Sequence, residues 1–397
     1  MAVADSPRIV TSAKPLTLAA YVSFFPIGVV TVLLGPMLPT LSAQWSLNYS
    51  QAGALFTAQY LTSTAAVALS GLMVARWGFR FAMKAGLLLA SVAVALLLAG
   101  PMWLGVVSIG AYGAGLGFAV PAANLLVAEV NPGRRSAVLN VLNFCWSAGA
   151  VACPFLVAVA VKNRMAPVFL FLLAGFMLLV TIGIAVMPAS IVEPARATGA
   201  KKEKVPIDWK HASLPVLGAL FFIYVGTENS FGGWVASYSK SLGNMTPTLS
   251  LMTPSFFYAA LTFGRLLAPA LLRMFDETFL VRAGLLVACS GTAGLMLSHA
   301  LTAVLASACV AGFGLAGVYP IMIALLSREF GPTAARVGSI MFTLSNLGGG
   351  LLPWIVGVAS NRFGTLKAGL AVPLIGTALM FVLYLRKWQP EAAEHVA

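Results

Sequence analysis

Long apolar runs separated by short polar connectors occupy almost the whole chain. Twelve of these runs reach the roughly 20 mostly apolar residues that a membrane-spanning helix needs. The first run is longer than the apolar core of a signal peptide, so we interpret it as a retained helix. We predict membrane helices at 17–43, 49–75, 81–101, 103–129, 136–161, 165–187, 212–242, 247–272, 278–298, 301–327, 334–359 and 366–386. The pattern therefore predicts an all-α membrane protein with twelve transmembrane helices.

One long polar segment, residues 188–211, divides the chain into two halves of six spans each. Sliding one half by 200 positions superposes Gly117 on Gly317, Glu129 on Glu329, Pro132 on Pro332 and Gly149 on Gly349. We predict an N-terminal six-helix bundle (1–187), a cytoplasmic linker (188–211) and a C-terminal six-helix bundle (212–397) that repeats the first. Transporters built from such parallel repeats bind their substrates near the middle of the membrane, between the halves.

The composition excludes a soluble globular domain. Apolar residues make up 60% of the 397 residues and charged residues 9%, whereas a soluble domain carries roughly 25% charged residues. The four cysteines lie inside apolar runs without CxxC spacing, and the three histidines lie at span ends or in a tail. We therefore expect no metal site, no cofactor and no enzyme activity.

The net charge of +13 comes from basic residues in the connectors. With the N-terminus placed inside, 18 of the 24 Lys and Arg residues lie on the inner side, 5 lie on the outer side, and Arg265 lies within a span. This bias predicts that both termini are cytoplasmic. We expect a monomeric, multi-pass protein of the inner or plasma membrane that contacts lipid and binds no nucleic acid.

The connector between the second and third spans carries a recognisable signature. The segment GLMVARWGFR supplies Gly71, Arg76, Gly78 and Arg80, with Ala75 where the signature has an acidic residue. Together with the two related halves, this segment resembles the major facilitator superfamily, and the resemblance covers essentially the whole chain. It implies the major facilitator fold, in which two pseudo-symmetric six-helix bundles rock about a central site.

A narrower resemblance is to the sugar branch of that superfamily that includes fucose permease and sodium-glucose-transporter-like proteins. It rests on Asn124 and Glu129, on LNVLNFCWSAGAVACP in the fifth span, on YVGTENSFGGW in the seventh, and on Phe263, Gly264 and Arg265 in the eighth. Proton-coupled members of the branch have carboxylates in the first and fourth spans. Here the first span has none and the fourth has Val120 at the relevant position, so the resemblance implies sugar transport without the usual N-half proton site.

Glu228 is the acidic residue that falls at the middle of a predicted span. An ionisable group at that depth costs at least about 2.5 kcal/mol on insertion scales, which makes it a functional candidate. We predict that Glu228 binds the coupling proton or accepts hydrogen bonds from substrate hydroxyls, and a structural ion pair with Arg265 is the alternative. Arg265 itself is expected to extend toward the cytoplasm, to be structural, or to bind an anionic substrate.

Polar residues recur at helical spacing along the spans, as Asn140, Asn143 and Ser147 do on the fifth. Lipid cannot satisfy such groups, so these faces are expected to turn inward. Amides both donate to and accept from hydroxyl groups, and aromatic rings can stack on a sugar ring. The predicted substrate-binding residues are Gln59, Asn124, Asn140, Asn143, Trp146, Glu228, Asn229, Trp234, Tyr238, Tyr258 and Asn346.

Charged residues also gather at the cytoplasmic ends of the spans. We predict that they form ion pairs that hold an inner gate shut, and the alternative is solvated charge that only sets topology. The predicted gating residues are Arg76, Arg80, Glu129, Arg134, Arg135, Arg273, Glu329 and Arg336.

These features predict a secondary-active or facilitative transporter of a neutral hydrophilic solute, specifically a hexose-type sugar, that works by alternating access. Coupling to H⁺ through Glu228, coupling to Na⁺ and uncoupled transport are all left open. The competing functions are organic-anion transport or drug efflux by the same fold, and a sensor that binds a solute without moving it.

Overall fold

The described chain is helical throughout. The computed structural model describes residues 14–187, 209, 211–243 and 246–385, and within these ranges it contains helices and turns but no strand. Eleven of the described helical segments are long and apolar enough to cross a membrane. The remaining predicted span is α9 (Pro247–Leu271), which packs among them.

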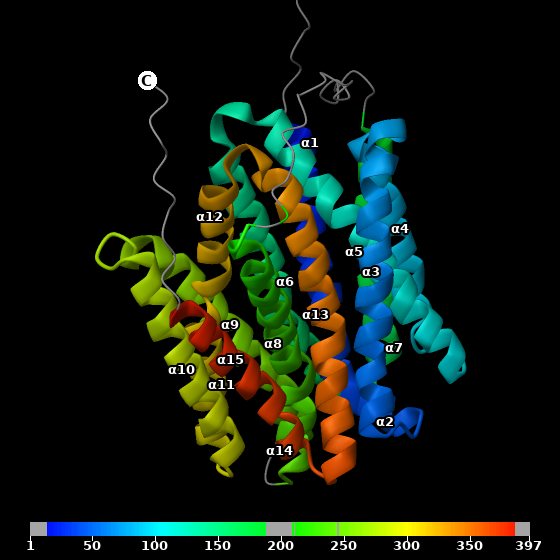
Figure 1. Cartoon of the computed structure of the whole chain (residues 1–397). Coiled ribbons are helices and arrows are strands. Elements are labelled where there is room, and N and C mark those ends of the chain that lie inside the picture. The colour runs from blue at the N-terminus through cyan, green and yellow to red at the C-terminus, as the bar shows by residue number, and fades with distance from the viewer. Residues whose placement is uncertain (1–13, 188–208, 210, 244–245, 386–397) are drawn as a thin grey trace, which may run out of the picture.

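The helices follow the predicted spans closely (Figure 1). The first half contains α1 (Lys14–Val32), α2 (Leu34–Gln44), α3 (Tyr49–Trp77), α4 (Phe79–Leu96), α5 (Met102–Val130), α6 (Arg135–Lys162) and α7 (Ala166–Val186). The second half contains α8 (Ser213–Ser241), α9, α10 (Glu277–Leu297), α11 (Leu301–Leu315), α12 (Val318–Phe330), α13 (Ala334–Phe363), α14 (Leu366–Gly369) and α15 (Ala371–Leu385). The prediction of twelve spans in two six-helix bundles is confirmed. Most of the predicted linker lies outside the described residues.

Three of the spans are broken into a pair of helices, and the twelfth is divided into α14 and α15 at Leu370. In the first span α1 ends at Val32 and α2 begins at Leu34, and in the tenth α11 ends at Leu315 and α12 begins at Val318. Pro36 and Pro320 follow these two breaks, and a proline has no N–H to donate to the carbonyl four residues earlier. Both breaks therefore leave backbone carbonyls that side chains of neighbouring helices can bind.

The two halves repeat each other in detail. The 3₁₀ turns η1 (Pro132–Arg134) and η2 (Gly331–Thr333) occupy equivalent connectors. Arg80, at the start of α4, donates to the carbonyls of Ile184 and Met187 at the end of α7, at 3.0 and 2.7 Å. Arg282, at the start of α10, donates in the same way to the Tyr384 carbonyl at the end of α15, at 2.8 and 3.0 Å. In each half an arginine thus caps the last helix of the bundle.

Replacing Arg282 by methionine is expected to lower the free energy of unfolding by about 1–2 kcal/mol, because a cation at a helix C-terminus stabilises the free carbonyls and the helix dipole. Thermal unfolding of the detergent-purified protein measures the loss. Arg134→Met, at an exposed position at the start of α6, is the matched control and should change stability little, because a cation at a helix N-terminus does not stabilise the helix dipole. An equal loss in both variants would contradict the capping role.

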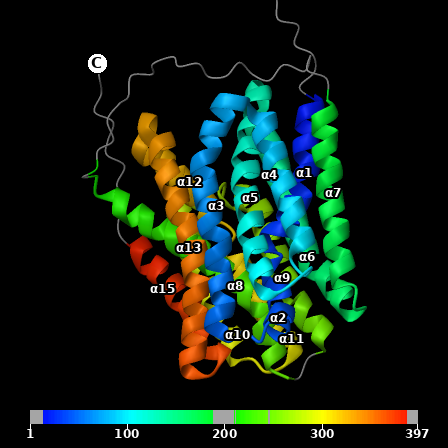
Figure 2. The ribbon, with the colours of Figure 1, turned by 90° about the vertical axis from the view of Figure 1, so that its right-hand side faces the viewer.

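The bundles contact each other toward one side of the molecule. We call the side where α1 begins, α7 ends and α8 begins the linker side. The contacts between halves lie toward the other side, where α2 packs on α8, α3 on α13 and α6 on α9. Figure 2 shows α3 crossing α13 in the lower part of the view, whereas α12 and the upper part of α3 stand apart.

Glycines allow the backbones to approach closely at these contacts. A Cβ on Gly35 of α2 would overlap the Gly232 carbonyl oxygen of α8, and a Cβ on Gly357 of α13 would overlap the Tyr49 carbonyl oxygen of α3. The third pair of helices is joined by the Ser255 hydroxyl, which donates to a backbone carbonyl of α6 at 2.8 Å. The side opposite the linker side is therefore closed by backbone-to-backbone packing.

Candidate functional site

A narrow recess lies where the break between α1 and α2 meets α3, α8 and α9. The free volume between its walls is about 10 Å³, roughly the room that one water molecule needs, whereas ligand pockets commonly measure about 300–1,000 Å³. The recess is thus tight in this conformation. Its walls are formed by Thr31, Val32, Leu34, Gly35, Phe56, Gln59, Tyr60, Asn229, Gly232, Gly233 and Tyr258.

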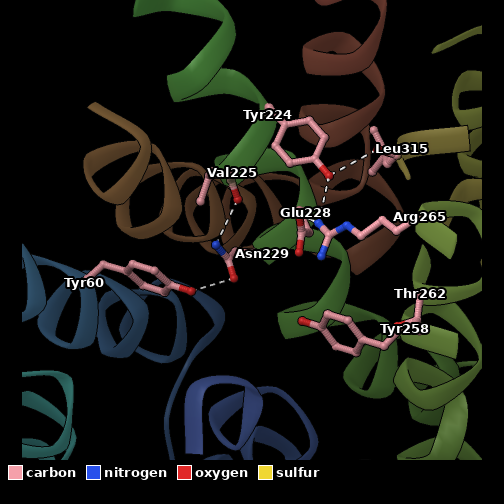
Figure 3. Close-up of polar contacts among 9 residues, drawn as sticks. All are labelled: Tyr60, Tyr224, Val225, Glu228, Asn229, Tyr258, Thr262, Arg265 and Leu315. Atoms are coloured by element: carbon pink, nitrogen blue, oxygen red, sulfur yellow. Dashed lines mark hydrogen bonds and ion pairs between the residues drawn. The ribbon is translucent and has the colours of Figure 1, made fainter. Parts of the chain in front are cut away.

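An ion pair lies beside this recess (Figure 3). Arg265 Nη2 of α9 lies 3.2 Å from Glu228 Oε2 of α8, and the two side chains are 26% and 13% exposed. Partial withdrawal from water makes it costly to leave either charge alone, so each compensates the other. The ion pair that we considered as the alternative role of Glu228 is present. The expectation that Arg265 extends toward the cytoplasm is wrong, because its guanidinium turns toward Glu228.

Tyr224 lies one helical turn from Glu228 on α8 and contacts the same guanidinium. Arg265 Nη2 donates to the Tyr224 hydroxyl at 3.3 Å, and this hydroxyl donates to the Leu315 carbonyl at 3.2 Å. The Tyr224 ring stacks on that of Tyr319, with centroids 5.3 Å apart and an interplanar angle of 29°. Tyr224 therefore connects the ion pair to the break between α11 and α12.

Asn229, the residue after Glu228, joins the two halves. The Tyr60 hydroxyl of α3 donates to Asn229 Oδ1 at 2.7 Å, and Asn229 Nδ2 donates to the Val225 carbonyl at 2.9 Å. Close by, the Thr57 hydroxyl of α3 donates to the Gly350 carbonyl of α13 at 3.1 Å. One turn of α8 thus carries both the paired carboxylate and a hydrogen bond to the other half.

Gln59 is held in place from the first half. Its Nε2 donates to the Thr31 carbonyl at 3.1 Å, beside the break between α1 and α2, and the Tyr112 hydroxyl donates to Gln59 Oε1 at 3.2 Å. Trp146 Nε1 donates to the Thr31 hydroxyl at 3.3 Å. The break in the first span is therefore bound by side chains, as the break in the tenth span is by Tyr224.

The structure brings some predicted substrate-binding residues together and leaves others apart. Gln59, Asn229 and Tyr258 line the recess, and Glu228 lies beside it. On α6, Asn140 and Asn143 are exposed toward the linker side, and Asn143 donates to the Leu139 carbonyl at 2.9 Å. The other two predicted amides are half-buried and do not line the recess: Asn124 on α5 and Asn346 on α13.

Trp234 and Tyr238 are buried outside the recess. Their side chains are 1% and 2% exposed, Trp234 Nε1 donates to the Pro353 carbonyl at 2.8 Å, and the Tyr238 hydroxyl donates to the Leu295 carbonyl at 3.1 Å. Neither residue lines the recess in this conformation, so their contact with substrate remains a prediction. Both residues pack the closed side, because α8 is surrounded by α2, α9, α13 and α15 and no face of it is free there.

Four of the predicted gating residues contact partners in their own half of the protein. Arg80 caps α7 as described, Arg135 Nε donates to the Ala128 carbonyl at 3.2 Å, and Glu329 Oε2 accepts from the Ser213 hydroxyl at 2.7 Å. Arg76 lies over the ring of Trp77, 5.1 Å from its centroid. The remaining members are exposed on the linker side: Glu129, Arg134, Arg273 and Arg336. Ion pairs between the halves therefore remain a prediction for a conformation in which these ends meet.

Sequence reasoning missed the tyrosines that organise the site. Tyr60 and Tyr224 contact Asn229 and Arg265. Tyr224 carries a usable signal, because it precedes Glu228 by four residues and so lies on the same helical face. Tyr60 gives no such signal, because its partner lies in the other half of the chain.

The geometry defines a membrane transporter with a polar site between two six-helix bundles. The sequence matches the Major Facilitator Superfamily over residues 20–353, and the chain belongs to this family. It is 20% identical over 363 residues to the glucose/mannose transporter GlcP of Bacillus subtilis (strain 168), covering 87% of this chain and 88% of that protein.

Solved structures of other transporters share the fold. A D-xylose-proton symporter superposes with a TM-score of 0.80 at 15% identity, covering 96% of this chain and 99% of that one. A mutant of the nucleoside transporter NupG gives a TM-score of 0.76 at 13% identity, covering 94% of this chain and 98% of that one. The transporter FucP gives 0.65 at 17% identity, covering 94% and 99%. The resemblance to the sugar branch of the superfamily is thus supported, and at these identities the structures show the fold alone.

Proposed function

We propose that this transporter carries a neutral polyhydroxylated solute, specifically a hexose-type sugar, by alternating access through the recess. One observation carries the proposal: the recess is lined by amides and hydroxyls, and the two charged groups beside it neutralise each other. Gln59 and Asn229 offer both donors and acceptors to solute hydroxyls, and Tyr60 and Tyr258 add hydroxyls and aromatic faces. A site with no net charge favours a neutral solute over an ion.

The comparison with GlcP supports this substrate class, because that protein is named for glucose and mannose and matches most of both chains. Organic-anion transport is the main competitor, since Arg265 could bind a carboxylate. Its Nη2 is already shared by Glu228 and Tyr224, which argues against an anion site in this conformation.

We further propose that the linker side faces the cytoplasm, as the distribution of basic residues predicts. The closed side would then be the outer one, and the conformation would be inward-facing. We propose a monomer of the inner or plasma membrane, with residues 1–187 and 212–397 moving as the two rocking bodies about the site between them.

Coupling is proposed to involve Glu228. Protonation would remove the negative charge that holds Arg265, so a proton and the ion pair compete for the same carboxylate. If this carboxylate carries the coupling proton, Glu228→Gln abolishes the dependence of uptake on a proton gradient. Uptake by the wild type that needs no gradient, or that follows a sodium gradient, would assign the protein to uncoupled or sodium-coupled transport instead.

Uptake into proteoliposomes tests the substrate class. Radiolabelled D-glucose, D-mannose, D-xylose, uridine and a dicarboxylate are offered with and without proton and sodium gradients. We expect saturable uptake of a hexose. Saturable uptake of uridine or the dicarboxylate alone would overturn the proposal, and binding without uptake of any solute would favour the sensor.

A conservative substitution tests whether the transported sugar binds in the recess. Tyr258→Phe removes one hydroxyl from its wall, and the loss of one hydrogen bond of about 1 kcal/mol is expected to raise the KM for the sugar about fivefold. Tyr49→Phe, in the first turn of α3 and outside the recess, is the matched control and should leave the KM unchanged. Equal effects of the two substitutions would place the sugar elsewhere.

A further inference from the structure

Tyr224 occupies an unusual position in the second half of the protein. Its side chain is fully buried, and it touches the end of α11, the start of α12 and the ion pair at the same time. The hydroxyl donates to the Leu315 carbonyl, the last residue of α11, and the ring stacks on Tyr319 in the first turn of α12. It thus contacts both sides of the break in the tenth span, and Figure 3 shows the contact with Leu315.

The break gives α12 freedom that an unbroken helix lacks. Residues 316 and 317 form a turn between the two helices, and Pro320 cannot donate to the Ala316 carbonyl. Few backbone hydrogen bonds therefore fix the angle between α11 and α12. Side-chain contacts across the break must supply the rest, and Tyr224 supplies two of them.

The hydroxyl of Tyr224 also depends on the ion pair. The same Arg265 Nη2 atom donates to Tyr224 and to Glu228. A cation that donates to a hydroxyl makes that hydroxyl a better donor in turn, because hydrogen bonds in a chain polarise one another. When Arg265 is released from Glu228, it loses its anchor, and the bond from Tyr224 to Leu315 weakens with it.

We infer that Tyr224 is a positioning residue that couples the state of the Glu228–Arg265 pair to the angle between α11 and α12. The inference rests on the proposed transport function, in which protonation of Glu228 releases the pair. With the pair intact, Tyr224 holds α12 in the position seen here. With the pair broken, α12 moves to a second position, and its linker-side end moves with it.

The test measures this coupling without a sugar, so that it does not depend on the substrate. Spin labels are placed on Ser327→Cys, at the linker-side end of α12, and on Leu72→Cys, near the linker-side end of α3; both positions are exposed. The four native cysteines are replaced, and the full chain is studied in lipid nanodiscs by pulsed electron–electron double resonance, which measures the distance between the two labels. The label distances are compared among the parent, Glu228→Gln, Tyr224→Phe and the combination of the two.

We expect Glu228→Gln to add a second distance population that the parent lacks. Tyr224→Phe, which keeps the ring stack but removes the hydroxyl, should add the same population, and Glu228→Gln should add nothing further in the Phe background. Tyr319→Phe is the matched control. It removes a hydroxyl from the other ring of the stack without touching Arg265, and in its background the effect of Glu228→Gln should be intact.

Two results would overturn the inference. One is an unchanged distance distribution in Glu228→Gln, and the other is a full effect of Glu228→Gln in the Tyr224→Phe background. If Glu228→Gln alone yields too little folded protein, Glu228→Gln combined with Arg265→Gln breaks the pair without an unpaired charge and replaces it in the comparison. Because no sugar is added, a protein that transports no hexose can still pass or fail this test.

Discussion

Arg265→Met is expected to destabilise the protein more than the double substitution Glu228→Gln with Arg265→Met. The single change leaves Glu228 as an uncompensated carboxylate that is 13% exposed. Breaking a buried pair costs about 3–5 kcal/mol, whereas replacing both partners by neutral groups is often close to neutral. The partial exposure of Arg265 lowers the cost, so about 2–4 kcal/mol is expected for the single variant.

Thermal unfolding of the purified variants measures these differences, and uptake assays on the same preparations separate stability from function. The double variant should recover most of the lost stability but should not recover transport, if the pair takes part in the transport cycle. Recovery of both would reduce the pair to a structural contact. An equally large loss of stability in the double variant would show that packing, rather than an unpaired charge, is responsible.

Gly35→Ala is expected to open the closed side of the molecule. The added methyl group would overlap the Gly232 carbonyl oxygen, and neither backbone can yield unless α2 and α8 separate. Overpacking of this kind costs about 1–3 kcal/mol, which shifts the balance between conformations about 5–150-fold. The conformation with the closed side open escapes this cost, because the two helices are apart in it.

Spin labels on Ala43→Cys and Ser241→Cys, at the ends of α2 and α8 on that side, report the separation. We expect longer distances in Gly35→Ala and a lower maximal uptake rate, since the conformation described here becomes less populated. Gly175→Ala is the matched control, because nothing lies within 4 Å of a Cβ at that position of α7. Unchanged distances in Gly35→Ala would refute the role of close backbone packing in closing this side.

The sequence predicted the spans, the duplication and the membrane class because these depend on local patterns. An apolar run of sufficient length must be a helix in lipid, where backbone groups need internal partners, so composition alone located α3 or α13 to within a few residues. The third span is the largest exception. It ends at Leu96 rather than at 101, because the segment ahead of Pro101 turns before the proline.

The site was predicted in part. Glu228 was identified because a carboxylate in the middle of a span is costly. The sequence did not decide whether Arg265 pairs with it, because several roles were open for Arg265. Trp234 was predicted to contact substrate from helical spacing alone. The consecutive residues Thr227, Glu228, Asn229 and Ser230 place polar groups on every side of α8, so helical spacing does not say which face meets the recess. Tyr60 carried no signal at all.

By itself the sequence determined twelve membrane helices, two related halves and a carboxyl group at mid-membrane, since length, hydropathy and repetition are properties of contiguous segments. Only the tertiary structure decided that Arg265 pairs with Glu228, that Tyr60 reaches Asn229 across the halves, and that arginines cap the last helix of each bundle. These contacts join residues tens to hundreds of positions apart. Which of them form depends on how closely the glycine-lined backbones approach and on how each helix is rotated, and neither follows from a local pattern.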